Sequence, residues 1–397
     1  MSRNKHALVL VFGDLGHSPR MQNHVWELVK IGYSVTFAGY SHSSLPTGMS
    51  TSTVNIMSLP AVPLKCISWL PIALRFLIQA IVKIFVQALY VLWVGLFKTP
   101  RLHVILVQSP PSLPTLLVGP LLAWWHKSQY IVDWHNVGYT ILAQTVKMPA
   151  VIGLAKATEL YLSRFANVSL VVSKAQQQWM QVNGGMKSIV VYDRPNTDLF
   201  KIPSPVQRRE FRKGFAESYG WDLNDDSALV VSSTSWTPDE DFWLLGDALN
   251  ILNKQLRSRG RQLYVVITGK GLLKSQFEEY VKTLSLSHVS LVTCWLSYED
   301  YAKLLGSADL GVSLHSSSSG VDLPMKAIDM IAVNLPVIAF RYAAIQELVP
   351  ADFLFSTKEE LADLIFRSVI AKSVKPYQYH LESWSEHWQA SVRPLLP

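Results

Sequence analysis

The stretch DLGVSLHSSSSGVDLPMKAIDMIAVNLPVIAF, from Asp309 to Phe340, decides the fold of the second half of the chain. Its first six residues form an apolar run that is typical of a buried parallel strand. A polar loop from His315 to Gly320 follows, and Pro324 can begin a helix because the first turn needs no proline N–H. Apolar residues then recur at helical spacing before a second apolar run, Val337 to Phe340. The stretch therefore predicts one strand–loop–helix–strand unit of a parallel sheet.

The polar loop of this unit is a candidate ligand site. A loop of serines and glycine before a helix offers N–H groups and hydroxyls to a phosphate or a sugar at the carboxyl end of a parallel sheet. The alternative is that the serines simply form the loop and cap the helix. The density of polar groups between apolar strands favours the ligand site. Its candidate residues are His315, Ser317, Ser318, Ser319, Gly320, Asp322, Lys326 and Asp329.

Length and composition narrow the class of protein. A chain of 397 residues can form two domains of ordinary size. Hydrophobic residues make up 49% and charged residues only 16%, and the many tryptophans and tyrosines indicate an amphipathic partner. The net charge of +7 suits an anionic lipid or a diphosphate substrate. Nucleic acid is not expected as a partner, because no basic run with interleaved aromatics occurs.

Metal and disulfide chemistry are not indicated by the sequence. Cys66 and Cys294 form neither a disulfide framework nor a zinc site, and they indicate a reducing compartment. No Asp-x-Asp motif stands beside a strand end, so we expect no metal site and no required cofactor, although a divalent cation could stimulate the protein. The amino terminus shows no signal-peptide pattern. Cationic groups would come from Lys270, Lys274 and Lys326.

The first half opens with two apolar strands, His6 to Phe12 and Tyr33 to Tyr40, around a helix. The loop after the first strand, GDLGHSPR, lacks the full dinucleotide fingerprint, and Asp14 would repel a pyrophosphate. We therefore assign the loop to the acceptor side of a cleft. A tight strand-to-helix turn that needs glycines is the alternative. The candidate acceptor residues here are Gly16, Ser18 and Arg20, and Ser18 is also expected to cap the helix that Pro19 begins.

A second polar cluster follows a later strand, Tyr130 to Asp133, which ends in DWHNVGYT. A histidine at the carboxyl end of a strand can act as a base near neutral pH. The alternative is a buried strand end whose hydrogen bonds are satisfied. The candidate residues of this cluster are Asp133, His135, Asn136 and Tyr139, the last two on the acceptor side.

The segment from Ile67 to Phe97 raises the question of a membrane. Arg75, Gln79, Lys83 and Gln87 recur every four residues and form one polar stripe on an otherwise apolar helix. Charges interrupt every window long enough to span a bilayer. Our preferred interpretation is a helix partly sunk in the membrane interface, with Arg75 and Lys83 reaching the headgroups. A helix buried within the protein and a spanning helix are the alternatives.

The second half follows a charged, irregular segment from Asp198 to Asp226. We expect one domain over residues 1–197, a second over 198–375 and a closing segment over 376–397. Trp384 and Trp388 stand at helical spacing in that segment, which predicts a helix packed against the body.

Two further loops in this half are ligand candidates. The strand Ala228 to Ser232 leads into SSTSWTPDED, in which Ser235 belongs to the ligand loop. Thr237, Pro238 and Glu240 predict a capping box for the next helix. The strand Gln262 to Thr268 leads to Gly269-Lys270-Gly271. A lysine there is a good contact for a diphosphate, and a plain glycine turn is the alternative.

Several motifs together resemble one family. GDLGHSPRM, QSPP, VDWHNVGY, YDRP, GKG and SLHSSSSGVDLPMKAIDM are similar to motifs of the β-1,4-mannosyltransferases of the dolichol-linked oligosaccharide pathway, and the resemblance covers nearly the whole chain. It implies a GT-B fold of two facing Rossmann-like domains. It also implies GDP-mannose as donor and dolichol-diphosphate chitobiose as acceptor. The expected place is the cytoplasmic face of the endoplasmic reticulum membrane, in N-glycosylation, with other enzymes of the pathway as possible partners.

The resemblance implies an inverting reaction, which needs a base on the acceptor hydroxyl. We expect His135 to be this base, with Asp133 and Asp14 as rivals. Lys270, Lys326 and the backbone of the serine loop would stabilise the leaving group. Related retaining enzymes carry two glutamates around the helix that Pro324 begins. Here Val321, with Asp322 beside it, occupies the first place and Asp329, the expected ribose partner, the second.

The sequence departs from the family in three places. Leu272 replaces a proline after the GKG motif, and Glu347 to Val349 replaces a longer loop. The family usually has an amino-terminal membrane anchor, whereas this sequence begins at its first strand. Three explanations are open: Ile67 to Phe97 is enough to hold the protein at the membrane, a partner holds it there, or the sequence is a shortened form. Two other classes stay open: a silent paralogue that docks a complex to the membrane, and a GT-B enzyme with another nucleotide sugar.

Overall fold

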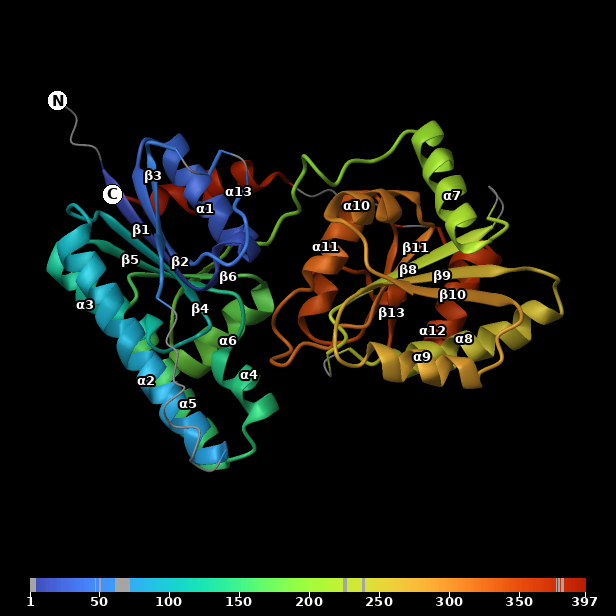
Figure 1. Ribbon diagram of the computed structural model, residues 1–397, viewed down its shortest axis with the longest axis horizontal. Helices are drawn as coiled ribbons and strands as arrows, with labels where there is room; N and C mark the ends of the chain where they lie inside the picture. The colour runs from blue at the N-terminus through green and yellow to red at the C-terminus, as the bar shows by residue number, and fades with distance from the viewer. Residues whose placement is uncertain are drawn as a thin grey trace. The chain divides into compact units, whose positions relative to one another are not determined.

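Two parallel sheets organise the chain, one in each of two units (Figure 1). The computed structural model describes residues 5–46, 48–49, 51–60, 72–223, 227–237, 240–375, 377, 379 and 382–397, and the side chains of 72–77 are not described. Unit 1 comprises Met1–Tyr192 with Trp384–Pro397, and unit 2 comprises Asp193–Ser383.

The sheet of unit 1 has the strand order β3-β2-β1-β4-β5-β6-β7, with all neighbours parallel. Its strands are β1 (His6–Asp14), β2 (Ser34–Tyr40), β3 (Val54–Ser58), β4 (Val104–Ser109), β5 (Gln129–Trp134), β6 (Val168–Val171) and β7 (Ser188–Val190). Its helices are α1 (Pro19–Lys30), α2 (Ile72–Trp93) with a π-helical turn (Val94–Lys98), α3 (Thr115–His126), α4 (Gly138–Thr145), α5 (Pro149–Leu162), α6 (Lys174–Gly184) and α13 (Trp384–Ser391). The order reverses between β1 and β4, which is where open α/β sheets bind ligands.

Strand β1 is buried on both faces of this sheet. Ala7 and Val9 pack with α1 and α13, whereas Leu8 and Leu10 pack with α2, α3 and α6. Because side chains alternate along a strand, a continuous apolar run serves both layers. The continuous apolar run from which β1 was predicted is therefore typical of a central strand that lies between two layers of helices.

The sheet of unit 2 has the order β10-β9-β8-β11-β12-β13, again all parallel. Its strands are β8 (Ala228–Thr234), β9 (Leu263–Gly269), β10 (Val289–Cys294), β11 (Leu310–Ser313), β12 (Val337–Phe340) and β13 (Leu354–Phe355). Its helices are α7 (Pro205–Tyr219), α8 (Phe242–Arg257), α9 (Lys274–Thr283), α10 (Tyr298–Ser307), α11 (Met325–Ala332) and α12 (Lys358–Ile365). The strand–loop–helix–strand unit predicted for Asp309 to Phe340 is confirmed as β11, α11 and β12. The strand order reverses between β8 and β11.

Three local predictions were wrong. The segment after Asp198, expected to be irregular, contains α7, which a capping box of Ser204 and Gln207 begins. Ser18 does not cap α1, because its hydroxyl donates to the carbonyl of Asp14. The cap of α8 is Asp241, which accepts the N–H of Leu244, so the expected cap Glu240 is free for another role. Pro238 and Asp239 lie outside the described residues.

The closing helix α13 packs on α1 within unit 1, as predicted for a terminal helix (Figure 1). Trp388 is completely buried, and its indole Nε1–H donates to Nδ1 of His24 at 2.9 Å. The ring of Trp384 meets the His24 ring edge-on. The last helix thus completes the core of unit 1.

Replacing Trp388 by Ala should destabilise unit 1 by about 3–5 kcal/mol, because the change leaves a large cavity. It also removes the hydrogen bond to His24. The matched control is Trp124→Ala, a change at a tryptophan of the same unit that is 78% exposed, which should shift stability by no more than about 0.5 kcal/mol. Thermal unfolding followed by circular dichroism measures both variants; equal melting temperatures would contradict the assigned role of α13.

Candidate active site

The candidate residues of unit 1 lie at the carboxyl ends of its central strands. Asp14 ends β1, Asp133 belongs to β5, and His135 follows β5 directly. Because β4 pairs with both β1 and β5, these strand ends lie at one edge of the sheet.

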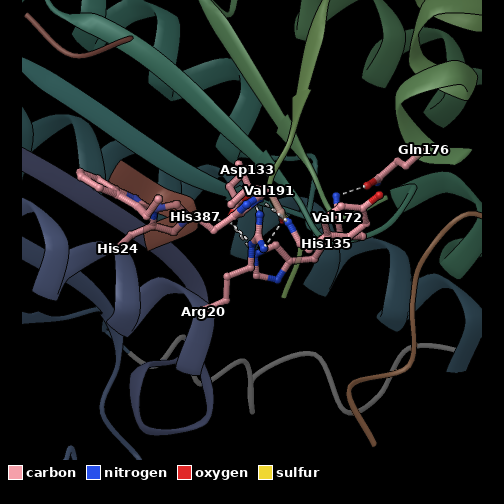
Figure 2. A network of polar contacts seen from close by, with 10 residues as sticks. Arg20, His24, Asp133, His135, Val172, Gln176, Val191 and His387 are labelled. Carbon is pink, nitrogen blue, oxygen red and sulfur yellow. Dashed lines mark hydrogen bonds and ion pairs between the residues drawn. The ribbon is translucent and has the colours of Figure 1, made fainter. Parts of the chain in front are cut away.

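Asp133 is the centre of a buried polar network (Figure 2). Its side chain is fully buried and accepts two hydrogen bonds of 2.7 Å from Nε and Nη2 of Arg20. Arg20 also donates to the carbonyl of Val191 and lies over the ring of Trp384. A planar guanidinium suits such bidentate pairing. Arg20 is only 5% exposed. It therefore positions Asp133, and its expected place in acceptor binding does not fit this burial.

His24 joins the network in one defined tautomer. The indole of Trp388 can only donate, so Nδ1 of His24 accepts and Nε2 carries the proton. Nε2 faces Oδ2 of Asp133 at 3.2 Å (Figure 2). Burial lowers the pKa of His24, which keeps this imidazole neutral near pH 7. The sequence analysis missed His24, which sits within an ordinary amphipathic helix.

His135 is the exposed member of the network. Its Nε2 lies 3.0 Å from Oδ2 of Asp133, and its side chain is 27% exposed. Within the described part of the chain, no hydrogen bond engages its other nitrogen, Nδ1. A carboxylate that accepts Nε2–H leaves the lone pair on Nδ1, so this imidazole is arranged as a general base.

The two rival bases do not fit their surroundings. Burial opposes ionisation of Asp133, but Arg20 and the two histidines outweigh it and hold the pKa of this carboxyl well below its usual range. Its oxygens are occupied by four donors, so it orients His135 and does not itself take a proton. A hydrogen bond from Ser43, and others from the backbone and His17, hold the pKa of Asp14 far below neutrality. A base should have a pKa near the working pH.

The other candidate acceptor residues lie near these loops. Gly16 packs so closely on Ser43 that a Cβ atom would come within 2.8 Å of it, and Ser18 is buried. Asn136 lies beside His135 in the loop, and Tyr139 opens α4, where Lys156 lies over its ring. The buried carboxylate of Glu159 accepts the N–H groups of Gly138 and Tyr139 at 2.8 Å each, and burial raises its pKa. Glu159 thus holds the loop after His135, a role that no local pattern indicated.

In unit 2, three polar loops meet because β8 lies between β9 and β11 in the sheet. The Nζ of Lys326 lies 2.8 Å from Glu240 and 3.2 Å from the hydroxyl of Ser235. Glu240 is 3% exposed and also accepts from Thr234 and from the N–H of Ser235. Glu240, predicted as a helix cap, instead fixes Lys326 and Ser235 together.

The serine loop folds around Asp322 instead of presenting all its hydroxyls. Ser317 and Ser319 donate to Oδ1 of Asp322, and His315 Nε2 lies 3.1 Å from Oδ2. The N–H of Gly320 donates to Ser317. Burial is outweighed by His315 and Ser317, which lower the pKa of Asp322. The hydroxyls of Ser317 and Ser319 are therefore engaged within the loop, and their contact with a donor stays a prediction. Ser318 lies in the same loop.

Asp329 lies on α11, 8% exposed, next to Tyr298 and Tyr301. Burial raises the pKa of Asp329 to about 8. No hydrogen bond or ion pair reaches this carboxyl from the residues that the structure describes. A carboxylate that is desolvated and has no donors is poised to accept hydrogen bonds from a ligand.

Lys270 is exposed, with its Nζ 4.3 Å from the centre of the Trp295 ring. The glycines on both sides of it are needed for packing, because a Cβ at Gly269 or Gly271 would lie about 2 Å from the carbonyl of Thr234 or Ser235. The GKG loop therefore lies against the Ser235 loop, while Lys274 is paired with Glu278. Among the described residues, no group of His, Cys, Asp and Glu could hold a metal ion.

Two units, each with a parallel Rossmann-like sheet and polar loops at the carboxyl ends of its strands, have the architecture of the GT-B class of glycosyltransferases. Residues 217–369 match the family model "Glycosyl transferases group 1". The fold is similar to that of sucrose-phosphate synthase from Thermosynechococcus elongatus, with a TM-score of 0.62, 16% identity, and coverage of 98% of this chain and 94% of that one.

Relatives that match over nearly the whole chain identify the family more narrowly than the family model or the fold does. The chain is 34% identical to the chitobiosyldiphosphodolichol beta-mannosyltransferase of Mus musculus, over 99% of this chain and 89% of that protein. It is also 34% identical to the "UDP-glycosyltransferase TURAN" of Arabidopsis thaliana, over 100% of this chain and 98% of that protein. The chain belongs to the chitobiosyldiphosphodolichol beta-mannosyltransferase family and is a glycosyltransferase.

The raised pKa of Asp329 predicts a pH-dependent stability. Between its ordinary value of 3.8 and about 8, the folded protein holds a proton on Asp329 that the unfolded chain has lost, so the free energy of unfolding falls as pH rises. Asp329→Asn removes this penalty. The melting temperature of Asp329→Asn minus that of the wild type should increase as the pH rises from 3.8 to about 8. Above about 8 this difference should stay constant.

The control is Asp247→Asn, because Lys358 lowers the pKa of Asp247. Its melting temperature should differ from the wild type by a constant amount across the same window. Parallel curves for Asp329→Asn and Asp247→Asn would show that Asp329 ionises normally.

Proposed function

We propose that this protein moves mannose from GDP-mannose to dolichol-diphosphate chitobiose with inversion and forms the β-1,4-mannoside. The observation that carries the proposal is the partly exposed imidazole of His135, held on the buried carboxylate of Asp133. The name of the Mus musculus relative, a chitobiosyldiphosphodolichol beta-mannosyltransferase, supports the acceptor and the sugar.

His135 acts as the general base in this proposal. The acceptor hydroxyl oxygen attacks the anomeric carbon of mannose while its proton passes to Nδ1 of His135. The bond between this carbon and the β-phosphate oxygen breaks, and GDP leaves with the electron pair. Asp133 stabilises the imidazolium that forms, and solvent later removes the proton. Arg20 balances the charge of Asp133 throughout.

Unit 2 binds the donor in this proposal. Lys326 and Lys270 counter the charge that develops on the diphosphate, and Ser235 is held beside Lys326 by Glu240. The ribose hydroxyls of the nucleotide donate to Asp329 and replace the donors that the buried carboxyl lacks. Binding of a ribose would lower the pKa of Asp329, since hydrogen bonds to the charged form favour it.

The cellular setting is part of the same proposal. The lipid-linked acceptor places the enzyme on the cytoplasmic face of the endoplasmic reticulum membrane, at an early step of lipid-linked oligosaccharide synthesis for N-glycosylation. Other glycosyltransferases of that pathway are the expected partners. No cofactor is required in this mechanism, and a divalent cation would act only by assisting departure of the diphosphate.

The base is tested by His135→Ala in an assay of labelled mannose transfer to phytanyl-diphosphate chitobiose. We expect a loss of roughly 10²–10⁴-fold in turnover, with GDP affinity unchanged. His288→Ala in unit 2 is the control and should keep full activity. Mannose transfer by His135→Ala at the wild-type rate would refute the assignment of His135 as the general base.

The same assay separates the alternatives. A wild-type protein that transfers no sugar without a partner is a silent subunit. Transfer from a UDP-sugar but not from GDP-mannose would instead follow the name of the Arabidopsis thaliana relative.

The donor site is tested by removing the Lys326 ion pair as a whole. The double variant Lys326→Met/Glu240→Gln avoids a lone buried charge, and its affinity for GDP should fall roughly tenfold or more, because a charged hydrogen bond is lost. Lys358→Met/Asp247→Asn is the matched control, since it removes another 2.9 Å lysine–carboxylate pair of unit 2. Calorimetry with GDP measures both; equal losses would exclude Lys326 from the site.

A further inference from the structure

Helix α2 contacts the sheet through Gln87 of its polar stripe and exposes a row of large apolar side chains on the opposite side. Gln87 is 3% exposed and donates to the hydroxyl of Tyr40, and Lys83 lies over the Tyr40 ring at 5.8 Å. On the opposite side, five large side chains that repeat every four residues are 46–73% exposed: Ile81, Phe85, Leu89, Trp93 and Phe97. In water alone, the apolar stripe of a surface helix faces the core.

Two neighbouring helices continue this apolar surface. In Figure 1, α2 lies along α3 and α5 on one side of the unit 1 sheet, and α3 contacts both of the others. The exposed side chains of α3 and of α5 with its following turn are Leu117, Leu121, Trp124, Trp125, Val151, Leu154, Tyr161 and Phe165. We call these side chains, with the five of α2, the apolar face. Contiguous surfaces of this kind mark interaction sites.

The segment of the chain that carries the apolar face is basic. From Leu28 to Tyr192 the chain contains twelve lysines and arginines but only two acidic residues. Both acids, Asp133 and Glu159, are buried. Lys98 lies 4.9 Å over the ring of Trp93 on the apolar face itself. A basic segment whose two acids are buried, with exposed tryptophans, fits anionic lipid headgroups over hydrocarbon.

We propose that the apolar face of unit 1 docks on an anionic lipid bilayer, an inference that rests on the proposed function in that the acceptor is lipid-linked. The segment Ile78–Lys98 is long and apolar enough to cross a membrane. However, Val91 is buried and Leu92 and Leu96 pack on the core of unit 1, so α2 stays attached to the sheet. A helix held in this way lies in the interface plane and immerses only its outer side. Arg75, expected to reach the headgroups, has no described side chain. Lys83 is exposed, with its Nζ 5.8 Å from the centre of the Tyr40 ring, and its contact with headgroups stays a prediction.

The test is flotation of the full chain with vesicles of phosphatidylcholine alone or mixed with phosphatidylserine. The wild type should bind, and more strongly to the mixed vesicles. Phe85→Glu/Leu89→Glu should reduce binding roughly tenfold or more, because two side chains that would enter the bilayer become charged. The single variant Trp124→Glu tests α3 in the same way.

The matched control is Leu272→Glu/Val206→Glu, which adds the same two charges at side chains of unit 2 that are 92% and 59% exposed. It should bind vesicles like the wild type. Because all these sites are exposed, circular dichroism should show unchanged folding. Binding of Phe85→Glu/Leu89→Glu at the wild-type level would overturn the proposal. So would a wild type that ignores vesicles but dimerises through this face, which would make a second copy the occupant.

Activity on a detergent-dispersed acceptor separates this inference from the proposed function. The docking variants should keep wild-type activity there and lose it on acceptor embedded in vesicles. A wild type that binds vesicles but transfers no mannose would refute the proposed function and leave the docking face standing. A wild type that transfers mannose without binding vesicles would refute the docking face and leave the proposed function standing.

Discussion

A carboxylate that is completely removed from water must be paired, and Asp133 meets this requirement in a way that connects most of unit 1. Arg20 of α1 pairs with it bidentately and also binds the backbone after β7, while His24 links it to Trp388 of the closing helix. The cost of desolvating a charge is recovered only with such complete hydrogen bonding. The same carboxylate orients His135, so the ion pair that holds β5, α1 and α13 together also defines the candidate base.

The two units treat a buried acid in opposite ways. Asp133 has four donors and a lowered pKa, whereas Asp329 has none within the described residues and a pKa raised to about 8. A buried carboxylate whose oxygens all accept hydrogen bonds is a fixed structural charge. A buried carboxylate without donors can accept hydrogen bonds from a ligand. The contrast separates the positioning residue of unit 1 from the ligand-binding candidate of unit 2, although both are buried aspartates.

Short-range patterns predicted most of the fold. Apolar runs located β1, β2, β8, β9, β11 and β12, because central parallel strands are apolar on both faces. The helix α7 was missed since a charged helix with a narrow apolar stripe resembles a linker, although its capping box was present in the sequence. At the candidate site, polar residues after strands predicted His135, Asp322 and Lys326 as candidates, and the structure places each of them in a polar network. Their partners could not be predicted: Arg20 lies 113 residues from Asp133, and Glu240 lies 86 residues from Lys326. Such pairs exist only once the sheet has formed.

Helix α2 shows why periodicity alone did not decide between the interpretations of its sequence. The four-residue spacing of Lys83 and Gln87 gives a polar stripe, but spacing cannot say which stripe faces the body. Tyr40, at the end of β2, supplies the answer, because its hydroxyl and ring are the partners of that stripe. Once the polar side is engaged, Phe85, Leu89 and Trp93 must face outward. A protein that exposes them to water loses the stabilisation that their burial would give, so this orientation supports the proposal that an apolar environment covers this side of unit 1.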